Sequence, residues 1–98
     1  MPTSVHVIVK LKARAGKKRV LRKLIEEGVP LTRKEKGCRK CVLMQDQQNT
    51  GILTLLEEWD TGADFDTHMA LPRLQKLVAQ LADVLEGPPD VSRHKQVA

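Results

Sequence analysis

The sequence predicts an α+β fold, in which short strands and amphipathic helices alternate along the chain. Residues 4–13, 38–47 and 52–59 alternate apolar with polar side chains or are apolar on both faces, which is typical of strands. Residues 20–25 and 74–85 carry apolar side chains at helical spacing. A chain of 98 residues is long enough for one domain and too short for two, so we expect a single domain over residues 1–98.

The first half of the chain predicts a strand followed by a basic helix. Residues 4–13 form the expected strand, and Gly16 ends it. The helix that follows has a basic outer face and an apolar stripe made of Val20, Leu21, Leu24 and Ile25. Gly28 and Pro30 interrupt this pattern, and residues 31–35 resume it for at most one turn before Gly37.

The middle of the chain predicts a hairpin. Residues 38–47 form its first strand, residues 48–51 are turn formers, and Ile52–Trp59 forms its second strand. Side chains two positions apart share a face of a strand. One face of the second strand therefore carries Leu53, Leu55, Glu57 and Trp59.

A helix with a histidine follows the hairpin. Thr61 is a suitable N-cap, and Asp64 matches the positive end of the helix dipole. Phe65, His68 and Met69 fall on one face of this helix. If that face packs on the Trp59 side of the strand, Glu57, Trp59 and His68 line one cleft.

The C-terminal part predicts one more helix and a last strand. Pro72 suits the first turn of a helix, and residues 87–89, Gly-Pro-Pro, stop it. Residues 91–97 form a short strand. The order of elements is thus β-α-β-β-α-β, the ferredoxin-like arrangement with an antiparallel sheet.

The second face of this sheet is also apolar, and the helices do not cover it. It carries Ile8, Val42, Met44, Ile52 and Leu56. A continuous apolar face of this kind is rarely left in water. We expect a second copy of the same sheet to cover it, which predicts a two-fold homodimer.

Positive charge is concentrated in one segment. Residues 10–40 hold 13 of the 17 lysines and arginines against three glutamates, so this segment has a net charge of +10 in a chain of +5. Such an excess indicates either an acidic partner, including nucleic acid, or a solvated helix face. The only aromatic residues besides histidine are Trp59 and Phe65, so recognition of single-stranded nucleic acid by stacking is poorly supported.

No apolar run reaches about 18 residues, and no signal-peptide pattern opens the chain. We therefore expect neither a membrane span nor secretion, and a cytoplasmic protein with reduced thiols. Cys38 and Cys41 are the only cysteines, so we do not expect a disulfide framework. In a strand they would point to opposite faces, and the sequence pairs no two further ligands with them, so we expect neither a dithiol redox site nor a metal site.

The order and spacing of three segments resemble the antibiotic biosynthesis monooxygenase family of dimeric α+β barrel proteins. The segments are VHVIVKLKARAGKK, RKEKGCRKCVLMQD and LLEEWDTGADFDTHMALPRLQKL. The resemblance implies a ferredoxin-like homodimer whose sheets close into a barrel, with a ligand pocket between sheet and helices. Some members oxidise phenols, quinols or anthrones with O2 and use no flavin, haem or metal, and some relatives degrade haem.

The resemblance also implies site residues. It points to Trp59 and His68 in the pocket, and less directly to Glu57. Val9 stands where the haem-degrading relatives have an asparagine, which argues against haem degradation. Arg73 stands where many members have a histidine, and Cys41 where a tyrosine is common.

The expected chemistry begins with removal of a proton from the substrate, because a phenolate gives up an electron to O2 more readily than a phenol. His68 suits the base, since an unperturbed imidazole has a pKa of about 6.5. Trp59 would stack on the substrate ring and offer its N–H. Glu57 would orient His68, or act as a base itself if burial raises its pKa.

The sequence therefore predicts a cofactor-independent monooxygenase acting on a quinol, a phenol or a polycyclic, polyketide-like aromatic. The same apolar pocket would serve a non-catalytic dimeric module that binds a small hydrophobic ligand, and the sequence does not separate the two. An RNA-recognition domain shares the order of elements, but the central strand carries leucines and acids where aromatics would be needed.

Overall fold

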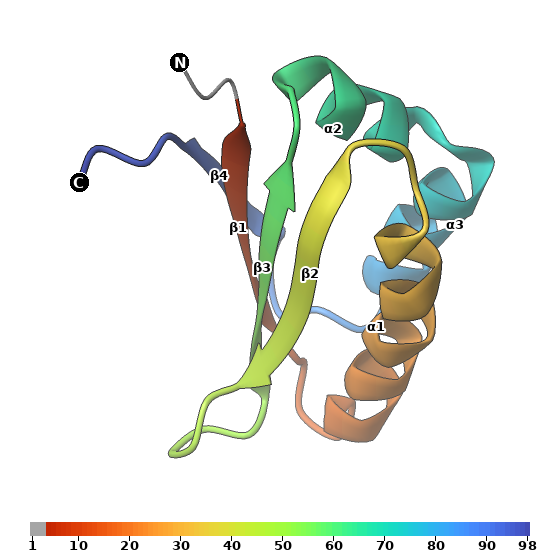
Figure 1. The fold of residues 1–98 in the computed structure, drawn as a ribbon. Helices are drawn as coiled ribbons and strands as arrows, with labels where there is room; N and C mark the ends of the chain where they lie inside the picture. Colours follow the sequence, from red (N-terminus) through yellow and green to blue (C-terminus); the bar gives the residue numbers. More distant parts are fainter. Residues whose placement is uncertain (1–3) are drawn as a thin grey trace.

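The computed structural model describes residues 4–98 and shows a four-stranded antiparallel sheet with helices packed on one face (Figure 1). The elements are β1 (Val5–Lys12), α1 (Lys18–Arg33), β2 (Cys38–Gln45), β3 (Ile52–Trp59), α2 (Gly62–Ala70), α3 (Pro72–Leu81) and β4 (Asp90–His94). The strands lie in the order β2-β3-β1-β4. The predicted α+β class and ferredoxin-like order are confirmed, with two consecutive helices between β3 and β4.

The core lies between the sheet and the helices, in two clusters. The larger cluster joins β1, β3, α1, α3 and the loop after α3, and its fully buried members include Leu11, Leu21 and Leu53. The smaller cluster consists of Val7, Trp59 and Phe65. The side chains of β3 alternate between the two faces of the sheet along its whole length. The set expected on one face therefore does face the helices: Leu53, Leu55, Glu57 and Trp59.

α1 is longer than the sequence pattern predicted. It continues through Gly28 and Pro30 as one helix of 16 residues. Its buried residues, Leu21, Ile25, Val29 and Thr32, keep the helical spacing past Pro30. Pro30 is exposed and removes only the one backbone hydrogen bond that its own N–H would have made. The longer helix places Thr32 and the residues after it beside α3.

α2 begins as predicted, and its first turn lies against the start of β2. The Thr61 side chain accepts a hydrogen bond of 3.1 Å from the backbone N–H of Asp64. Gly37 has a φ of +84°, and a Cβ there would collide with the Asp64 side chain. Only glycine satisfies both conditions, so Gly37 fixes how closely the loop before β2 approaches α2.

β2 contains a bulge that changes where its cysteines point. Cys38 pairs with Trp59 and Lys40 pairs with Glu58, so Arg39 is an extra residue in the strand. Cys38 and Cys41 consequently face the same side, toward the helices. The expectation of opposite faces was wrong, because it assumed a regular strand.

The other face of the sheet carries an apolar row. Val42, Leu56 and Ile8 are neighbours across three strands, and each is half-buried. Met44 on the same face is 44% exposed. The helices leave this face uncovered (Figure 1). Its coverage by a second copy stays a prediction.

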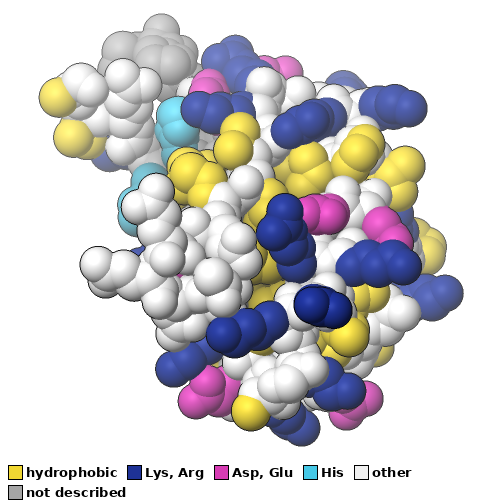
Figure 2. Space-filling view, turned by 90° about the horizontal axis from the view of Figure 1, so that it is seen from below, with side chains coloured by type: hydrophobic (Ala, Val, Ile, Leu, Met, Phe, Trp, Pro, Cys, Tyr) yellow, Lys and Arg dark blue, Asp and Glu magenta, His cyan; other side chains and the backbone are white. Residues whose placement is uncertain are grey.

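The positive charge is dispersed over the surface. Figure 2 shows the end of the molecule where α1 begins, with lysine and arginine side chains separated by apolar and acidic ones. Several form exposed ion pairs, such as Lys12 with Glu86 at 3.4 Å and Arg22 with Glu26 at 2.6 Å.

Among residues 4–98, no helix has the length and apolar character that crossing a membrane requires.

Candidate active site

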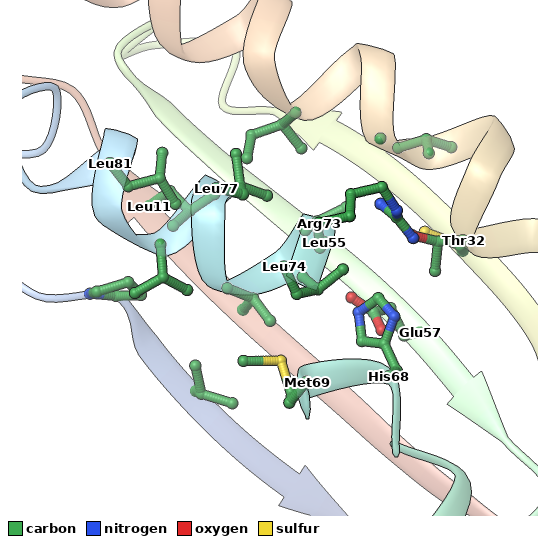
Figure 3. A pocket seen from close by; sticks show the side chains of 18 of the residues that line it. Leu11, Thr32, Leu55, Glu57, His68, Met69, Arg73, Leu74, Leu77 and Leu81 are labelled. Atoms are coloured by element: carbon green, nitrogen blue, oxygen red, sulfur yellow. The ribbon is translucent and has the colours of Figure 1, made fainter. Parts of the chain in front are cut away.

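A cavity of about 100 Å³ lies between the sheet and the helices. Its walls are mostly apolar and come from β1, β3, α1, α2, α3 and the start of β4. Polar side chains are restricted to one part of the lining: Thr32, Glu57, His68 and Arg73. Figure 3 shows them gathered at one end, with Leu11 and Leu81 at the other.

His68 is the central side chain of the polar end. α2 presents it on the same face as Phe65, and it is only 4% exposed. Its Nδ1 lies 2.8 Å and 2.9 Å from the two carboxylate oxygens of Glu35. An ionised carboxylate only accepts hydrogen bonds, so Nδ1 is the nitrogen that carries the proton in the neutral ring.

The second ring nitrogen of His68 is left for a ligand. Nε2 has no hydrogen-bond partner among residues 4–98. Every fully buried polar side-chain atom in this part of the chain does have a partner. Nε2 is therefore not fully buried, and His68 lines the cavity. With Nδ1 protonated, Nε2 presents a lone pair.

Arg73 and Glu35 extend the site behind His68. An Arg73 Nη2 forms an ion pair with Glu35 and also lies 3.5 Å from the hydroxyl of Thr32. Arg73 comes from α3, Thr32 from α1, and Glu35 from the turn after α1. The three elements thus meet at one chain of contacts, from Arg73 through Glu35 to His68. The positive charge of Arg73 compensates the carboxylate, which in turn holds the imidazole.

Glu57 forms the opposite side of the polar end. Its Oε1 accepts a hydrogen bond of 2.8 Å from the indole Nε1 of Trp59. Burial raises the pKa of Glu57 and the negative charge of Glu35 adds to the rise, whereas the Trp59 hydrogen bond and the charge of His68 offset part of it. Glu57 therefore holds a proton closer to neutral pH than an exposed glutamate does.

Trp59 lies behind the cavity wall. It is fully buried and does not contribute to the lining. Its ring centroid lies 4.8 Å from that of His68 and 6.1 Å from that of Phe65. The structure thus brings Glu57, Trp59 and His68 together as expected, but only Glu57 and His68 face the cavity. Trp59 packs against His68 and holds Glu57.

Glu35 and Arg73 were not predicted as site residues. Arg73 was noted only because many family members have a histidine at this position. Glu57 was expected to orient His68, whereas Glu35 lies beside its Nδ1. The sequence does carry one signal, since Glu35 is the only acidic residue between Glu27 and Asp46, within a run of lysines and arginines.

Metal and thiol chemistry receive little support from the described residues. Among residues 4–98, no group of three or more His, Cys, Asp or Glu side chains is placed to hold a metal ion. Burial raises the pKa of the Cys41 thiol to about 12, and it also raises that of Cys38. Both thiols therefore stay protonated at neutral pH, which makes them weak nucleophiles and weak ligands.

Comparison with known proteins identifies related chains. A family model described as antibiotic biosynthesis monooxygenase matches residues 4–80, which include the whole polar end of the cavity. The structure is similar to Rv0793 of Mycobacterium tuberculosis, with 27% identity, a TM-score of 0.90, and coverage of 97% of this chain and 96% of that one. No curated protein matches the sequence.

Two further solved structures are similar over nearly their full lengths. One is described as an antibiotic biosynthesis monooxygenase, with 26% identity, a TM-score of 0.88, and coverage of 96% of this chain and 99% of that one. The other is PA3566 of Pseudomonas aeruginosa, with 20% identity, a TM-score of 0.92, and coverage of 100% and 98%. At this lower identity the second likeness shows the fold alone.

Proposed function

The chain belongs to the antibiotic biosynthesis monooxygenase family, and from this premise we propose that it oxidises a phenol or quinol with O2, without flavin, haem or metal. One observation carries the proposal: His68 is held at Nδ1 by Glu35 and presents Nε2 to an apolar cavity. An oriented imidazole in a site of low polarity is what removal of a phenolic proton requires.

In the proposed reaction, Nε2 of His68 takes the proton of the substrate hydroxyl. The imidazolium that forms is stabilised by the adjacent carboxylate of Glu35, which is also paired with Arg73. The phenolate then gives an electron to O2 more readily than the phenol. For a phenol with a free para carbon, the balanced outcome is a para-quinone and water: one oxygen atom replaces hydrogen on carbon, and the other is reduced to water.

Glu57 has a different role in this proposal from the one expected for it. Glu35, and not Glu57, lies beside Nδ1 of His68. Burial raises the pKa of Glu57, so its protonated form, which donates a hydrogen bond, persists to a higher pH than in an exposed glutamate. We assign this hydrogen bond from Glu57 to the substrate oxygen, which gains negative charge when His68 removes its proton. Trp59 keeps Glu57 in place through its N–H.

We also propose that the protein is a homodimer that buries the uncovered face of the sheet. The row of Val42, Leu56 and Ile8 supports this, because it is continuous across β2, β3 and β1. The cavity opens on the helical side of the sheet, so a partner on the other face would leave it accessible.

The experiment that tests the activity is O2 uptake with a panel of phenols, quinols and anthrones, after removal of metal and flavin. We expect uptake above autoxidation for at least one compound, and a fall of about 10²- to 10⁴-fold in the His68→Ala variant. His94→Ala is the matched control, since His94 is exposed on β4. Equal rates in the wild type and His68→Ala would contradict the role of His68. Uptake equal to buffer throughout, with saturable binding, would favour the non-catalytic binding module.

A further inference from the structure

The cavity adjoins a groove on the outer surface. Gly28, Arg73 and Leu77 line both the cavity and a separate hollow of about 390 Å³ between α1 and α3. Figure 3 shows Arg73 reaching from α3 toward Thr32 of α1. The shortest route from the cavity to the groove therefore passes Gly28 and the side chains of Arg73 and Leu77.

The cavity is too small for a polycyclic ligand. Its volume is about 100 Å³. For comparison, an engineered apolar cavity of about 150 Å³ in another protein holds one benzene molecule. The space therefore holds at most a single aromatic ring, and any further part of the ligand has to leave the cavity.

The groove suits an aliphatic chain. Its floor includes Leu24, Leu31 and Leu77, and Leu31 is 48% exposed. Its rim carries Glu27, Lys76 and Gln80. An apolar floor with a polar rim recognises hydrocarbon and offers few fixed partners for a polar substituent.

Gly28 leaves room for the Arg73 side chain beside the route from cavity to groove. A glycine inside a helix is less stable than an alanine at the same position. Its backbone does not demand glycine, because Gly16 and Gly37 are the only positive-φ residues in the described part of the chain. A Cβ at Gly28 would lie 3.5 Å from Nη1 of Arg73, an ordinary contact. Packing thus admits alanine, whereas a longer side chain would fill the passage.

We propose that the substrate is a single-ring phenol or quinol with an aliphatic substituent, whose ring occupies the cavity and whose chain lies in the groove between α1 and α3. This inference rests on the proposed function for the position of the hydroxyl at His68. It adds the size of the ring system, the chemical nature of the substituent, and its path past Gly28.

Binding without turnover tests this directly. Trp59 is the only tryptophan, and its ring lies 4.8 Å from that of His68, so its fluorescence reports occupation of the cavity. The titrations use phenol and its propyl, pentyl and heptyl derivatives, substituted at position three or four, without oxygen. We expect Kd to fall along at least one series, by up to about fourfold per methylene, as burial of hydrocarbon predicts.

Two variants at one position form the matched pair. Gly28→Ala should keep the gain with chain length, because its methyl group makes only an ordinary contact. Gly28→Leu should abolish the gain with chain length, because its longer side chain occupies the route to the groove. Val91→Glu tests the other opening, which lies beside Val78, Pro89 and Val91.

The outcomes separate this inference from the proposed function. Two results would overturn the inference alone. In the first, phenol binds but a longer alkyl chain does not lower Kd. In the second, the longer alkyl chain still lowers Kd in Gly28→Leu and no longer does so in Val91→Glu. Absence of saturable binding by phenol and every derivative would overturn the proposed function and, with it, the inference.

Discussion

Nδ1 of His68 lies 2.8 Å from Oε1 and 2.9 Å from Oε2 of Glu35, although the two residues are 33 positions apart in the chain. The carboxylate thus faces the ring nitrogen that points away from the cavity. This arrangement fixes the tautomer of the imidazole and supports the charge that it gains on protonation. Glu35 is therefore a positioning residue for His68, which would touch the substrate.

Replacement of the Glu35 carboxylate should slow the reaction without weakening binding. In Glu35→Gln the amide oxygen still accepts the Nδ1 proton, but the negative charge that stabilises the imidazolium is lost. We expect kcat to fall about tenfold or more, since a charge-assisted hydrogen bond exceeds a neutral one by about 1–2 kcal/mol. The Kd of phenol, measured by Trp59 fluorescence without oxygen, should stay the same. A parallel loss of binding would show that Glu35 only maintains the shape of the cavity.

Loss of the Arg73 charge should destabilise the protein. Arg73→Met leaves Glu35 half-buried and paired only with His68, which should lower the free energy of unfolding by about 1–3 kcal/mol. Arg73→Lys keeps the charge and should lose less. Urea denaturation at pH 7 measures both variants. Equal stability of the Met variant and the wild type would show that the ion pair contributes little.

Glu57 should make stability depend on pH in a direction unusual for a glutamate. Its pKa is raised by burial, so the folded protein binds this proton more tightly than the unfolded chain. Stability is therefore lost as pH rises from about 4.3, the unfolded-state value, through the raised pKa. Glu57→Gln does not titrate, and its amide oxygen still accepts from Trp59. The difference in free energy of unfolding, variant minus wild type, should rise between pH 4 and pH 7. A constant or falling difference would contradict the effect of burial.

Cys41 should resist alkylation in the folded protein. Burial raises the pKa of its thiol to about 12, and the side chain is 3% exposed. At pH 8 very little of it is thiolate, the reactive form. Mass spectrometry after iodoacetamide treatment should find Cys41 unmodified until denaturant is added, and Cys38→Ser isolates its signal. Rapid labelling of Cys41 in that variant without denaturant would show that this part of β2 opens readily.

The uncovered sheet face should determine the oligomeric state. We expect light scattering at micromolar concentration to give the mass of two chains. Leu56→Glu places a charge at the centre of the row of Val42, Leu56 and Ile8, so it should yield a monomer. Val78→Glu, an exposed position on the helical side, should stay dimeric. A monomeric wild type would contradict the proposed dimer.

Regular periodicity made most of the fold predictable. The alternation in β1 and β3 located both faces of the sheet, and Thr61 located the start of α2 because a cap is a local interaction. Two elements were misjudged where local rules gave way to tertiary packing. α1 passes through Pro30 because buried residues continue on both sides of it. The bulge at Arg39 turns Cys38 toward the helices, and no pattern in the sequence marks it.

The site was predicted only where its residues lie close in sequence. Glu57, Trp59 and His68 share one strand-turn-helix segment, so their proximity followed from local geometry. The contact of Glu35 with His68 depends on the full length of α1, which brings the turn after it to α2, and sequence spacing does not reveal this. Trp59 was expected in the cavity, but its N–H is satisfied inside the core by Glu57, so the ring is fully buried.

The tautomer of His68 decides whether its Nε2 can accept a proton from a substrate. Nitrogen-15 NMR of the labelled protein at pH 8 distinguishes a protonated from an unprotonated ring nitrogen, and His68→Ala assigns the signal. We predict a proton on Nδ1, bound to Glu35, and an unprotonated Nε2 that shifts when phenol is added. A proton on Nε2 with an unprotonated Nδ1 would contradict the account, because such a ring could neither donate to Glu35 nor accept a proton from a substrate in the cavity.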